Sequence, residues 1–255
     1  MTSERVVLLT SDGESGRIAA SWLAAAFPDL TVIVEQPISR LVLMKRRLRR
    51  QGAIRVGGQL AFMAFQRLQQ WRTRKRIVEL VRINQFKTEW PRLHAPLHVD
   101  SVNSPECIAH LRAYDPHVVL VVGTRLIDSA VLTGIGTPFI NYHAGITPKY
   151  RGVHGGYWAI AKADPGNFGV TVHLVDAGID TGGVLYQARL IPTARDNFST
   201  YPYLQMAAAL PLLGQAARDA IAGMLKTQRV DLPSRLWSHP TLWFYLATGF
   251  RHGAW

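Results

Sequence analysis

The chain has 255 residues, of which 48% are hydrophobic and 18% are charged, and its formal net charge at pH 7 is +12. This composition is ordinary for a globular protein and excludes wholesale disorder, and the length suffices for one large α/β domain with or without a small appendage. The single cysteine, Cys107, excludes an internal disulfide and a cysteine-based metal cluster, so we expect it to fill space in the core.

Most of the positive charge lies in one segment. Residues 40–92 contain 15 basic and two acidic side chains, a net charge of +13, whereas the remainder has 14 basic and 15 acidic side chains. The rest of the chain is therefore nearly neutral. An anionic partner would bind to residues 40–92.

The amino terminus lacks the basic start and the apolar run of a secretory signal. No apolar segment approaches the roughly 18 residues that cross a bilayer. We therefore expect a cytoplasmic protein, and the basic segment leaves open a peripheral attachment to the inner face of a membrane.

The first elements predict the start of a parallel sheet. Apolar runs at residues 6–10 and 31–35 flank a helical pattern, which is a β-α-β arrangement. The turn at residues 11–16 could hold a phosphate on its backbone amides, but Asp12 and Glu14 would repel an anion. We favour a plain turn with a helix cap at this place.

Residues 41–86 have a helical pattern, with a predicted break near Gly57-Gly58. In the second half apolar residues recur at steps of three or four and predict one apolar face beside basic side chains. Two interpretations stay open: a helical insertion packed on the sheet with its charges in water, or a basic amphipathic surface for an anionic membrane, nucleic acid or a protein partner. The residues of the predicted apolar face are Leu60, Met63, Ala64, Leu68 and Trp71.

The middle of the chain predicts the centre of the sheet. Residues 97–99 favour an edge strand, and Ser104 followed by Pro105 is typical of a helix start. The continuous β-branched run at 117–123 is typical of a central parallel strand. Residues 124–127 follow at its carboxyl end, where ligands of open α/β sheets bind.

The remaining elements complete a Rossmann-like α/β fold, an open and mostly parallel sheet with helices on both faces. We divide the chain into a catalytic domain, 1–230, which includes the basic helical insertion 40–92, and an aromatic tail, 231–255. The tail has no fold that the sequence predicts, and its aromatic cluster makes it a candidate interface of a homo-oligomer. The later predicted elements are helices at 156–163 and 199–226 and paired strands at 168–175 and 184–190.

The candidate active site begins on a short strand at residues 139–142. Because strand side chains alternate between faces, Asn141 and His143 must point the same way at its carboxyl end. An amide and an imidazole therefore share one wall of a pocket. The loop that follows, 144–152, contains glycine and proline residues that force turns.

Three motifs carry a resemblance to a known family: Asn141-Tyr142-His143, Pro148-Lys149-Tyr150-Arg151-Gly152, and Gly169-Val170-Thr171-Val172-His173 with Gly178-Ile179-Asp180-Thr181-Gly182. Together they resemble the folate-dependent formyltransferases, which include phosphoribosylglycinamide, methionyl-tRNA and nucleotide-sugar formyltransferases. The resemblance is firm over residues 118–190 and loose over 6–35. It implies transfer of a formyl group from 10-formyltetrahydrofolate to a primary amine, without a metal.

Carried over by position, the resemblance implies that Asn141, His143 and Asp180 are catalytic. The Asn141 amide and a protonated His143 would stabilise an oxyanion, an effect of about 2.7–4 kcal/mol for each donor. Asp180 would keep His143 charged and handle the proton of the attacking amine. For His173, a core position and a supporting role stay equally open, and His154 would either touch the acceptor or be exposed.

Other residues follow from the same resemblance. The cofactor-binding residues would be Gly123, Thr124, Arg125, Leu126, Ile127, Asp176 and Gly178. The residues that shape the loop or touch the substrate would be Pro148, Tyr150, Arg151, Gly152, His154, Thr181 and Gly182.

The acceptor is the least determined part of the prediction. An amino sugar, nucleotide-linked, or another small amine leads, because residues 12–15 replace the phosphate loop of the glycinamide ribonucleotide enzymes with acidic residues. A methionyl-tRNA acceptor is encouraged by the basic segment, but about 30 residues after the last long helix are too few for a further barrel domain. A membrane-surface or partner-binding module on the same scaffold is a non-enzymatic alternative. The sequence lacks the motifs that are typical of hydrolases and of metalloenzymes.

Overall fold

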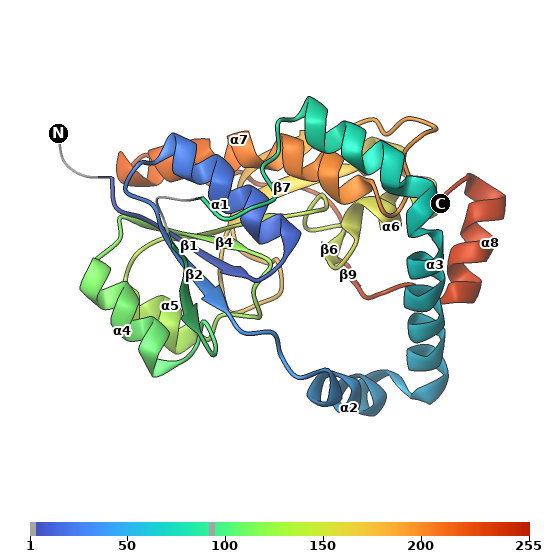
Figure 1. The fold of residues 1–255 in the computed structure, drawn as a ribbon, viewed down its shortest axis with the longest axis horizontal. Helices are drawn as coiled ribbons and strands as arrows, with labels where there is room; N and C mark the ends of the chain where they lie inside the picture. Colours follow the sequence, from blue (N-terminus) through green and yellow to red (C-terminus); the bar gives the residue numbers. More distant parts are fainter. Residues whose placement is uncertain (1–3, 92–94) are drawn as a thin grey trace.

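The computed structural model describes residues 4–91 and 95–255 and contains a seven-stranded sheet in the order β3-β2-β1-β4-β5-β7-β8 (Figure 1). Strands β1 to β5 run parallel, whereas β7 and β8 are antiparallel additions beside β5. This confirms the predicted Rossmann-like, mostly parallel sheet. The strands are β1 (Val6–Ser11), β2 (Thr31–Glu35), β3 (Leu97–Val99), β4 (Val118–Val122), β5 (Phe139–His143), β7 (Gly169–Leu174) and β8 (Val184–Arg189).

Helices cover both faces of the sheet. Helices α1 (Glu14–Ala26) and α7 (Tyr201–Ile221) lie on one face, and α4 (Pro105–Tyr114) and α5 (Ser129–Ile135) lie on the other (Figure 1). Alternate residues of each central strand therefore enter two different cores. In β1, Val6 and Leu8 pack with α1 and α7, while Val7 and Leu9 pack with α4 and α5. Burial on both faces explains why the central strands are continuous apolar runs.

The sequence predicted the starts of α1 and α4, and the predicted cap is confirmed for α4 alone. Ser104 caps α4 by accepting a hydrogen bond from the N–H of Cys107, as predicted. The residue that precedes α1 is Gly13, which has no side chain to cap it, so neither Asp12 nor a serine acts as the predicted cap. Asp12 instead pairs with Arg17 at 2.8 Å.

The basic segment forms two helices, α2 (Arg40–Gln51) and α3 (Ala53–Ile83). The chain turns between them at Gly52, which has a left-handed φ of +77°, so the predicted break at Gly57-Gly58 is wrong. Gly58 lies inside α3, where an added Cβ would come within 2.1 Å of the Trp243 ring. The glycine is used for close packing against the C-terminal tail and not for a turn. Residue 92, the predicted end of this segment, lies outside the described residues.

The face that α3 buries is not the one that its periodicity predicted. Val56, Phe62 and Leu80 are buried, and the helix contacts α7 and α8 (Leu242–His252) at the rim of the molecule. Of the two interpretations left open, a helical insertion packed on the sheet is therefore wrong in its packing, because α3 packs on helices and its predicted apolar face is in water. The residues that the structure leaves exposed are Leu60, Met63, Ala64, Leu68 and Trp71.

The C-terminal tail is folded onto the catalytic body. Its strand β9 (Leu236–Trp237) pairs with β6 (Arg151–Gly152), and α8 packs on α3 and α6 (Gly155–Ala161). Trp237 stacks on Trp158 with their ring centroids 4.4 Å apart. A short 3-10 helix, Pro165–Asn167, lies between α6 and β7. Among the described helices, none combines the length and apolar character required to cross a bilayer.

Candidate active site

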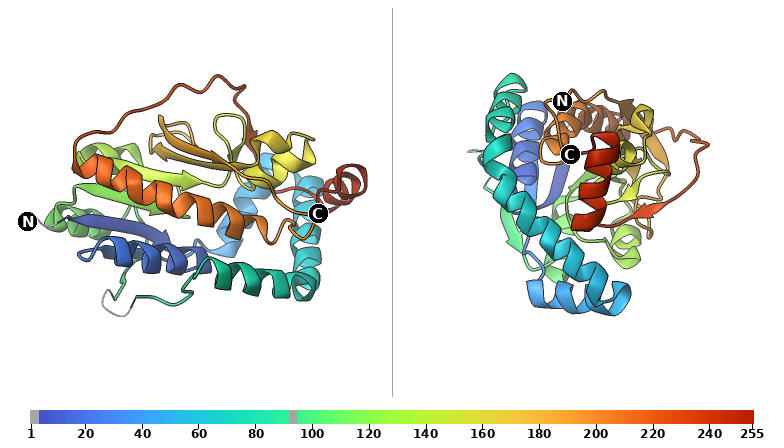
Figure 2. Two further views of the ribbon diagram at one scale, coloured as in Figure 1. Left: turned by 90° about the horizontal axis from the view of Figure 1, so that it is seen from above. Right: turned by 90° about the vertical axis from the view of Figure 1, so that its right-hand side faces the viewer.

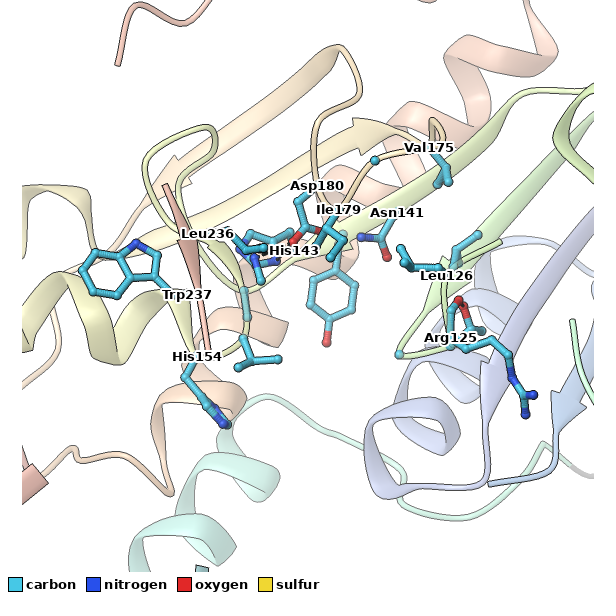
Figure 3. Close-up of a pocket in the computed structure, with 18 of the residues that line it drawn as sticks. Arg125, Leu126, Asn141, His143, His154, Val175, Ile179, Asp180, Leu236 and Trp237 are labelled. Carbon is cyan, nitrogen blue, oxygen red and sulfur yellow. Dashed lines mark hydrogen bonds and ion pairs between the residues drawn. The ribbon is translucent and has the colours of Figure 1, made fainter. Parts of the chain in front are cut away.

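The three predicted catalytic residues line one cavity of about 740 Å³ at the carboxyl ends of β4 and β5. Figure 3 shows Asn141, His143 and Asp180 side by side on its wall, with Leu126 near Asn141. The predicted segment 123–127 contributes to the same wall. The volume suits a small organic ligand.

A network of hydrogen bonds and close contacts joins the three residues through a fourth, His173. The antiparallel register of β5 and β7 places Asn141 opposite His173, and the Asn141 Nδ2 atom lies 3.1 Å from His173 Nε2. His173 Nε2 lies 3.6 Å from Asp180 Oδ1, and His143 Nδ1 lies 3.4 Å from Asp180 Oδ2. His173 is thus buried next to the predicted catalytic groups and contacts two of them. The other nitrogen of His173, Nδ1, lies 2.7 Å from the Leu174 carbonyl, which can only accept, and so it carries a proton.

The loop that carries Asp180 is held by its own hydrogen bonds. Asp176 accepts from the N–H of Gly178 at 3.0 Å and from the Thr181 hydroxyl at 2.7 Å. Gly182 passes so close to the Leu174 carbonyl that an added Cβ would lie 1.7 Å from its oxygen. Asp180 itself has a left-handed φ of +50°. These contacts place its carboxylate against β6, where the Gly152 N–H donates to Oδ2 at 2.7 Å.

The protonation state of His143 differs from the prediction. Burial lowers the pKa of His143 below its ordinary value, although the Asp180 carboxylate and the Tyr150 carbonyl act to raise it. The imidazole is therefore neutral at neutral pH, which corrects the prediction that Asp180 keeps it charged. Its Nε2 lies 2.5 Å from the Tyr150 carbonyl and must donate, so Nδ1 is the nitrogen free to accept a proton.

Asp180 is the charged member of the site. Burial acts to raise the pKa of Asp180, but the His173 side chain, the nearby His143 and the Gly152 N–H together lower it below its ordinary value. The carboxylate is therefore ionised at neutral pH. A neutral imidazole beside an ionised carboxylate gives two groups that can accept a proton.

The other end of the cavity has an apolar lining. Val121, Leu126, Val175 and Ile179 line it, and more than half of the Leu126 side chain is exposed there. Apolar side chains beside backbone polar groups suit a flat heterocycle. Gly123, Thr124, Leu126 and Ile127 line the same cavity, and their contact with a cofactor stays a prediction.

Arg125 lines the cavity as predicted, but its guanidinium is engaged by neighbouring segments. Its Nε and its backbone N–H each lie 2.6 Å from the carboxylate of Glu35, and Nη2 bonds to the carbonyls of Gln36 and Asp100. Figure 3 shows the guanidinium turned away from the catalytic residues. The side chain therefore fixes the loop 123–127 to β2 and leaves ligand contact to the backbone.

Within the described residues, no group of three His, Cys, Asp or Glu side chains is placed to hold a metal ion.

The sequence of this chain matches a known protein family. Residues 68–202, more than half of the chain, match the family described as Formyl transferase. The chain belongs to the formyl transferase family. This confirms the resemblance that the three motifs carry.

Part of this formyl transferase family member is similar to curated methionyl-tRNA formyltransferases. A methionyl-tRNA formyltransferase from Chlorobium chlorochromatii is 32% identical over 106 residues, which are 41% of this chain and 33% of the relative. The chain thus spans about a third of the length of this curated relative.

Two solved structures share the fold. A glycinamide ribonucleotide transformylase from Symbiobacterium toebii has a TM-score of 0.58 and 18% identity, and the match covers 89% of this chain and 92% of that one. A formyltransferase from Anoxybacillus kamchatkensis, solved with UDP-4,6-dideoxy-4-formamido-L-AltNAc and tetrahydrofolate, has a TM-score of 0.51 and 13% identity, and the match covers 91% of this chain and 85% of that one.

The predicted loop residues of this family member mostly shape the site. Tyr150 is buried and its hydroxyl donates to Asp164 at 2.6 Å. The Pro148 carbonyl accepts from the Arg235 N–H at 3.1 Å. Gly152 has a φ of +94°, and an added Cβ would lie 2.2 Å from the Trp237 carbonyl. Arg151 lies on β6 next to it. Their common effect is to seat the C-terminal strand β9 beside the catalytic loop.

His154 is half-buried, lines the cavity and is paired with a histidine of the tail, so the predicted alternative of an exposed loop histidine is wrong. Its Nε2 lies 2.9 Å from His239 Nδ1. Burial, together with His239 and Arg47, lowers the pKa of His154 to about 3, and burial together with Arg47 lowers the pKa of His239 to about 4. Both rings are therefore neutral at neutral pH.

Sequence reasoning missed the wall of the cavity that comes from the basic segment and the tail. Arg47 and Gln51 of α2 and residues 236–239 of the tail line it. No motif marks these positions, because they come from segments outside the family resemblance. Within the part of the chain that the structure describes, Arg47 forms no salt bridge, which leaves its charge available to a ligand.

Proposed function

We propose that this protein transfers a formyl group from 10-formyltetrahydrofolate to the primary amine of an amino sugar that carries a phosphate, most simply a nucleotide-linked one. The observation that carries the proposal is the placement of a neutral His143, an ionised Asp180 and the Asn141 amide on one wall of one cavity. Membership of the formyl transferase family supports it.

The reaction forms a bond between the acceptor nitrogen and the formyl carbon and breaks the bond between that carbon and N10 of the folate. The acceptor nitrogen loses a proton and N10 gains one, so the protein needs a group that accepts and then donates. Asp180 and His143 Nδ1, 3.4 Å apart, can take this proton between them. Once protonated, His143 becomes a donor and can deliver the proton to the leaving nitrogen.

Hydrogen-bond donors on the same wall would stabilise the oxyanion that forms on the formyl oxygen. One N–H of the Asn141 amide faces His173 Nε2, which leaves the second N–H for the developing negative oxygen. The His143 imidazolium formed during the reaction supplies another donor. Because the imidazole starts neutral, its charge appears together with the negative charge that it stabilises.

Folate binding is proposed for the apolar end of the cavity. Val121, Leu126 and Val175 can contact a pteridine ring, and the backbone of residues 123–127 can bond to its polar edge. The tetrahydrofolate bound in the Anoxybacillus kamchatkensis structure supports a folate co-substrate. The group that folate supplies is the activated formyl.

A phosphorylated acceptor is proposed for the opposite wall. Arg47 provides a cation there, and Gln51 and His239 provide polar groups. A second cavity of about 800 Å³ shares Gln51 and residues 236–239 with the first. Arg55, Lys162 and Arg235 line it, and the described lining residues include no carboxylate. An anion is therefore favoured along this side.

The test uses purified protein with 10-formyltetrahydrofolate and a panel of amines: amino-sugar nucleotides, their dephosphorylated sugars, glycinamide ribonucleotide and methionyl-tRNA. Release of tetrahydrofolate is followed by absorbance and the formylated product by mass spectrometry. We expect turnover with an amino-sugar nucleotide and none with the His143→Asn variant. Turnover with methionyl-tRNA alone would replace the sugar acceptor, and no turnover with any amine would count against formyl transfer.

A further inference from the structure

The surface of α3 that faces solvent has an unusual composition. Five apolar residues follow one another at helical spacing and lie on one face, yet all are exposed; Leu68 is 75% exposed and Trp71 is 71% exposed. Val78, also exposed, extends the row by two turns. We call this row the outer stripe. Its residues are Leu60, Met63, Ala64, Leu68, Trp71 and Val78.

Basic side chains lie among the residues of the outer stripe. Arg67, Arg72, Arg74 and Lys75 are all exposed. The neighbouring helices continue the pattern: α2 exposes Leu41 and Leu48 among four Lys and Arg side chains, and α8 exposes Trp243 and Phe250. Figure 2 shows α2, α3 and α8 facing the viewer together in its right-hand view.

The charge on these three helices has one sign. By sequence they contain 14 Lys and Arg residues and a single acidic residue, Glu79. Glu79 is already paired with Arg76 at 3.2 Å and with Arg195. Arg76 is also paired with Asp196 at 2.8 Å. The other described Lys and Arg side chains of these helices form no salt bridge, so a partner that is anionic and able to take up apolar side chains suits this surface.

We propose that the outer stripe, with the exposed residues of α2 and α8 beside it, binds the surface of an anionic lipid membrane. Leu, Met and Trp side chains would enter the boundary between headgroups and acyl chains, and the Lys and Arg side chains would meet the lipid phosphates. The helices would lie on the membrane, because none of those described can span it.

Two other partners fit the surface less well. A second copy of this chain would bring the same cations face to face, which like-charge repulsion opposes. RNA would neutralise the Lys and Arg side chains, but its phosphates leave aliphatic side chains such as Leu60, Met63 and Leu68 without a partner. A lipid surface satisfies both kinds of side chain.

The experiment measures sedimentation of the full chain with vesicles of phosphatidylcholine, either alone or mixed with phosphatidylglycerol. We expect binding to the mixed vesicles and little to the neutral ones. The double variant Leu68→Glu/Trp71→Glu should bind at least about 100-fold more weakly, since burying each large side chain accounts for about a tenfold change. The matched control is Met224→Glu/Ile191→Glu, which adds the same two charges at exposed apolar positions outside the three helices, and it should bind nearly as the unmodified chain does.

A second measurement separates apolar insertion from adsorption by charge. Lipids with brominated acyl chains should quench the tryptophan fluorescence of the bound chain, and Trp71→Phe should remove a large part of the quenching. Equal binding of the two double variants, or binding without quenching, would overturn the proposal. Failure of the chain to bind vesicles would also overturn the proposal. RNA would then be the partner if the chain bound RNA, and a second copy would be the partner if the chain formed a dimer that Leu68→Glu/Trp71→Glu abolishes.

These readouts do not depend on formyl transfer. Both double variants should retain the transfer rate of the unmodified chain on a soluble acceptor, which also shows that they fold. A chain that binds vesicles but formylates nothing would contradict the proposed function alone.

Discussion

The catalytic pocket and the helical arm α2–α3 hold their charges in different ways. At the catalytic wall of the pocket the ionisable groups are largely enclosed and have partners: Asp180 accepts from the Gly152 N–H, and His143 Nε2 donates to the Tyr150 carbonyl. On the arm most cations are in water, interleaved with exposed apolar side chains. A buried charge sets the protonation state of its neighbours, whereas a cluster of exposed charges sets which large surface the molecule approaches.

The largest effect is expected from removing the pocket charge. Asp180→Asn should lower kcat for formyl transfer by about 10²–10⁴-fold, because the proton of the acceptor amine loses its ionised acceptor. Steady-state kinetics with a saturating acceptor measures this. Binding of tetrahydrofolate, followed by fluorescence, should be retained, and a kcat within about tenfold of the unmodified value would contradict the assigned role.

The two faces of α3 should differ sharply in stability. Phe62 is 2% exposed, with its ring centroid 4.8 Å from that of Phe198 and 5.0 Å from that of Tyr245. Phe62→Ala should lower the free energy of unfolding by about 3–5 kcal/mol. Leu68→Ala, on the outer stripe of the same helix, should change it by no more than about 0.5 kcal/mol. Urea denaturation compares them, and equal losses would show that the stripe is packed after all.

The half-buried pair of His154 and His239 should make stability depend on pH. The pKa values of His154 and His239, about 3 and about 4 in the folded chain, lie below the value of about 6.5 for an unfolded histidine. The unfolded chain therefore binds more protons below pH 6.5, and stability should fall as the pH is lowered. Between pH 6.5 and 5 each histidine should cost roughly 2 kcal/mol.

The matched variant for this prediction is His239→Gln, which removes one titrating group and should reduce the loss by roughly 2 kcal/mol. His143, whose pKa is also lowered, adds the same loss to both proteins. Carboxylates with lowered pKa values, such as Asp180, titrate below this window and do not confuse the comparison. Denaturant unfolding of both proteins at pH 6.5 and at pH 5 measures the loss in the free energy of unfolding. Identical pH dependence in both proteins would contradict the neutral pair.

The smallest effect is expected where the arm meets the pocket. Arg47→Gln should raise KM for a phosphorylated acceptor by about tenfold, since one charged contact is lost, and leave kcat and the KM for the folate unchanged. The dephosphorylated sugar serves as the control substrate and should respond little. An equal change in KM for both sugars would show that Arg47 does not contact the phosphate.

Much of the catalytic body could be predicted from the sequence. The apolar runs that form β1, β2 and β4 appear as strands at the predicted places, and β4 lies at the centre of the sheet. These strands are buried on both faces, so local composition was enough. The cavity that joins Asn141, His143 and Asp180 also agrees with the sequence, because alternation along β5 and the spacing of the motifs restrict where these side chains can lie.

The sequence did not predict what depends on partners distant in the chain. Periodicity marked the apolar face of α3, but the rings of Phe198 and Tyr245 cover the opposite side, at Phe62. The aromatic tail had no predicted fold because β9 exists only by pairing with β6. His173 could have been found from the register of β5 and β7, which places it opposite Asn141.

By itself, then, the sequence determined the sheet, the family and the residue types of the active site, since strand burial and motif spacing are local properties. The tertiary structure decided the protonation state of His143, the turning of the Arg125 guanidinium away from the catalytic residues, and the wall that Arg47 and His239 contribute. It also decided which face of α3 meets solvent. Burial depends on which distant segments pack together, and burial sets both pKa values and exposed surfaces.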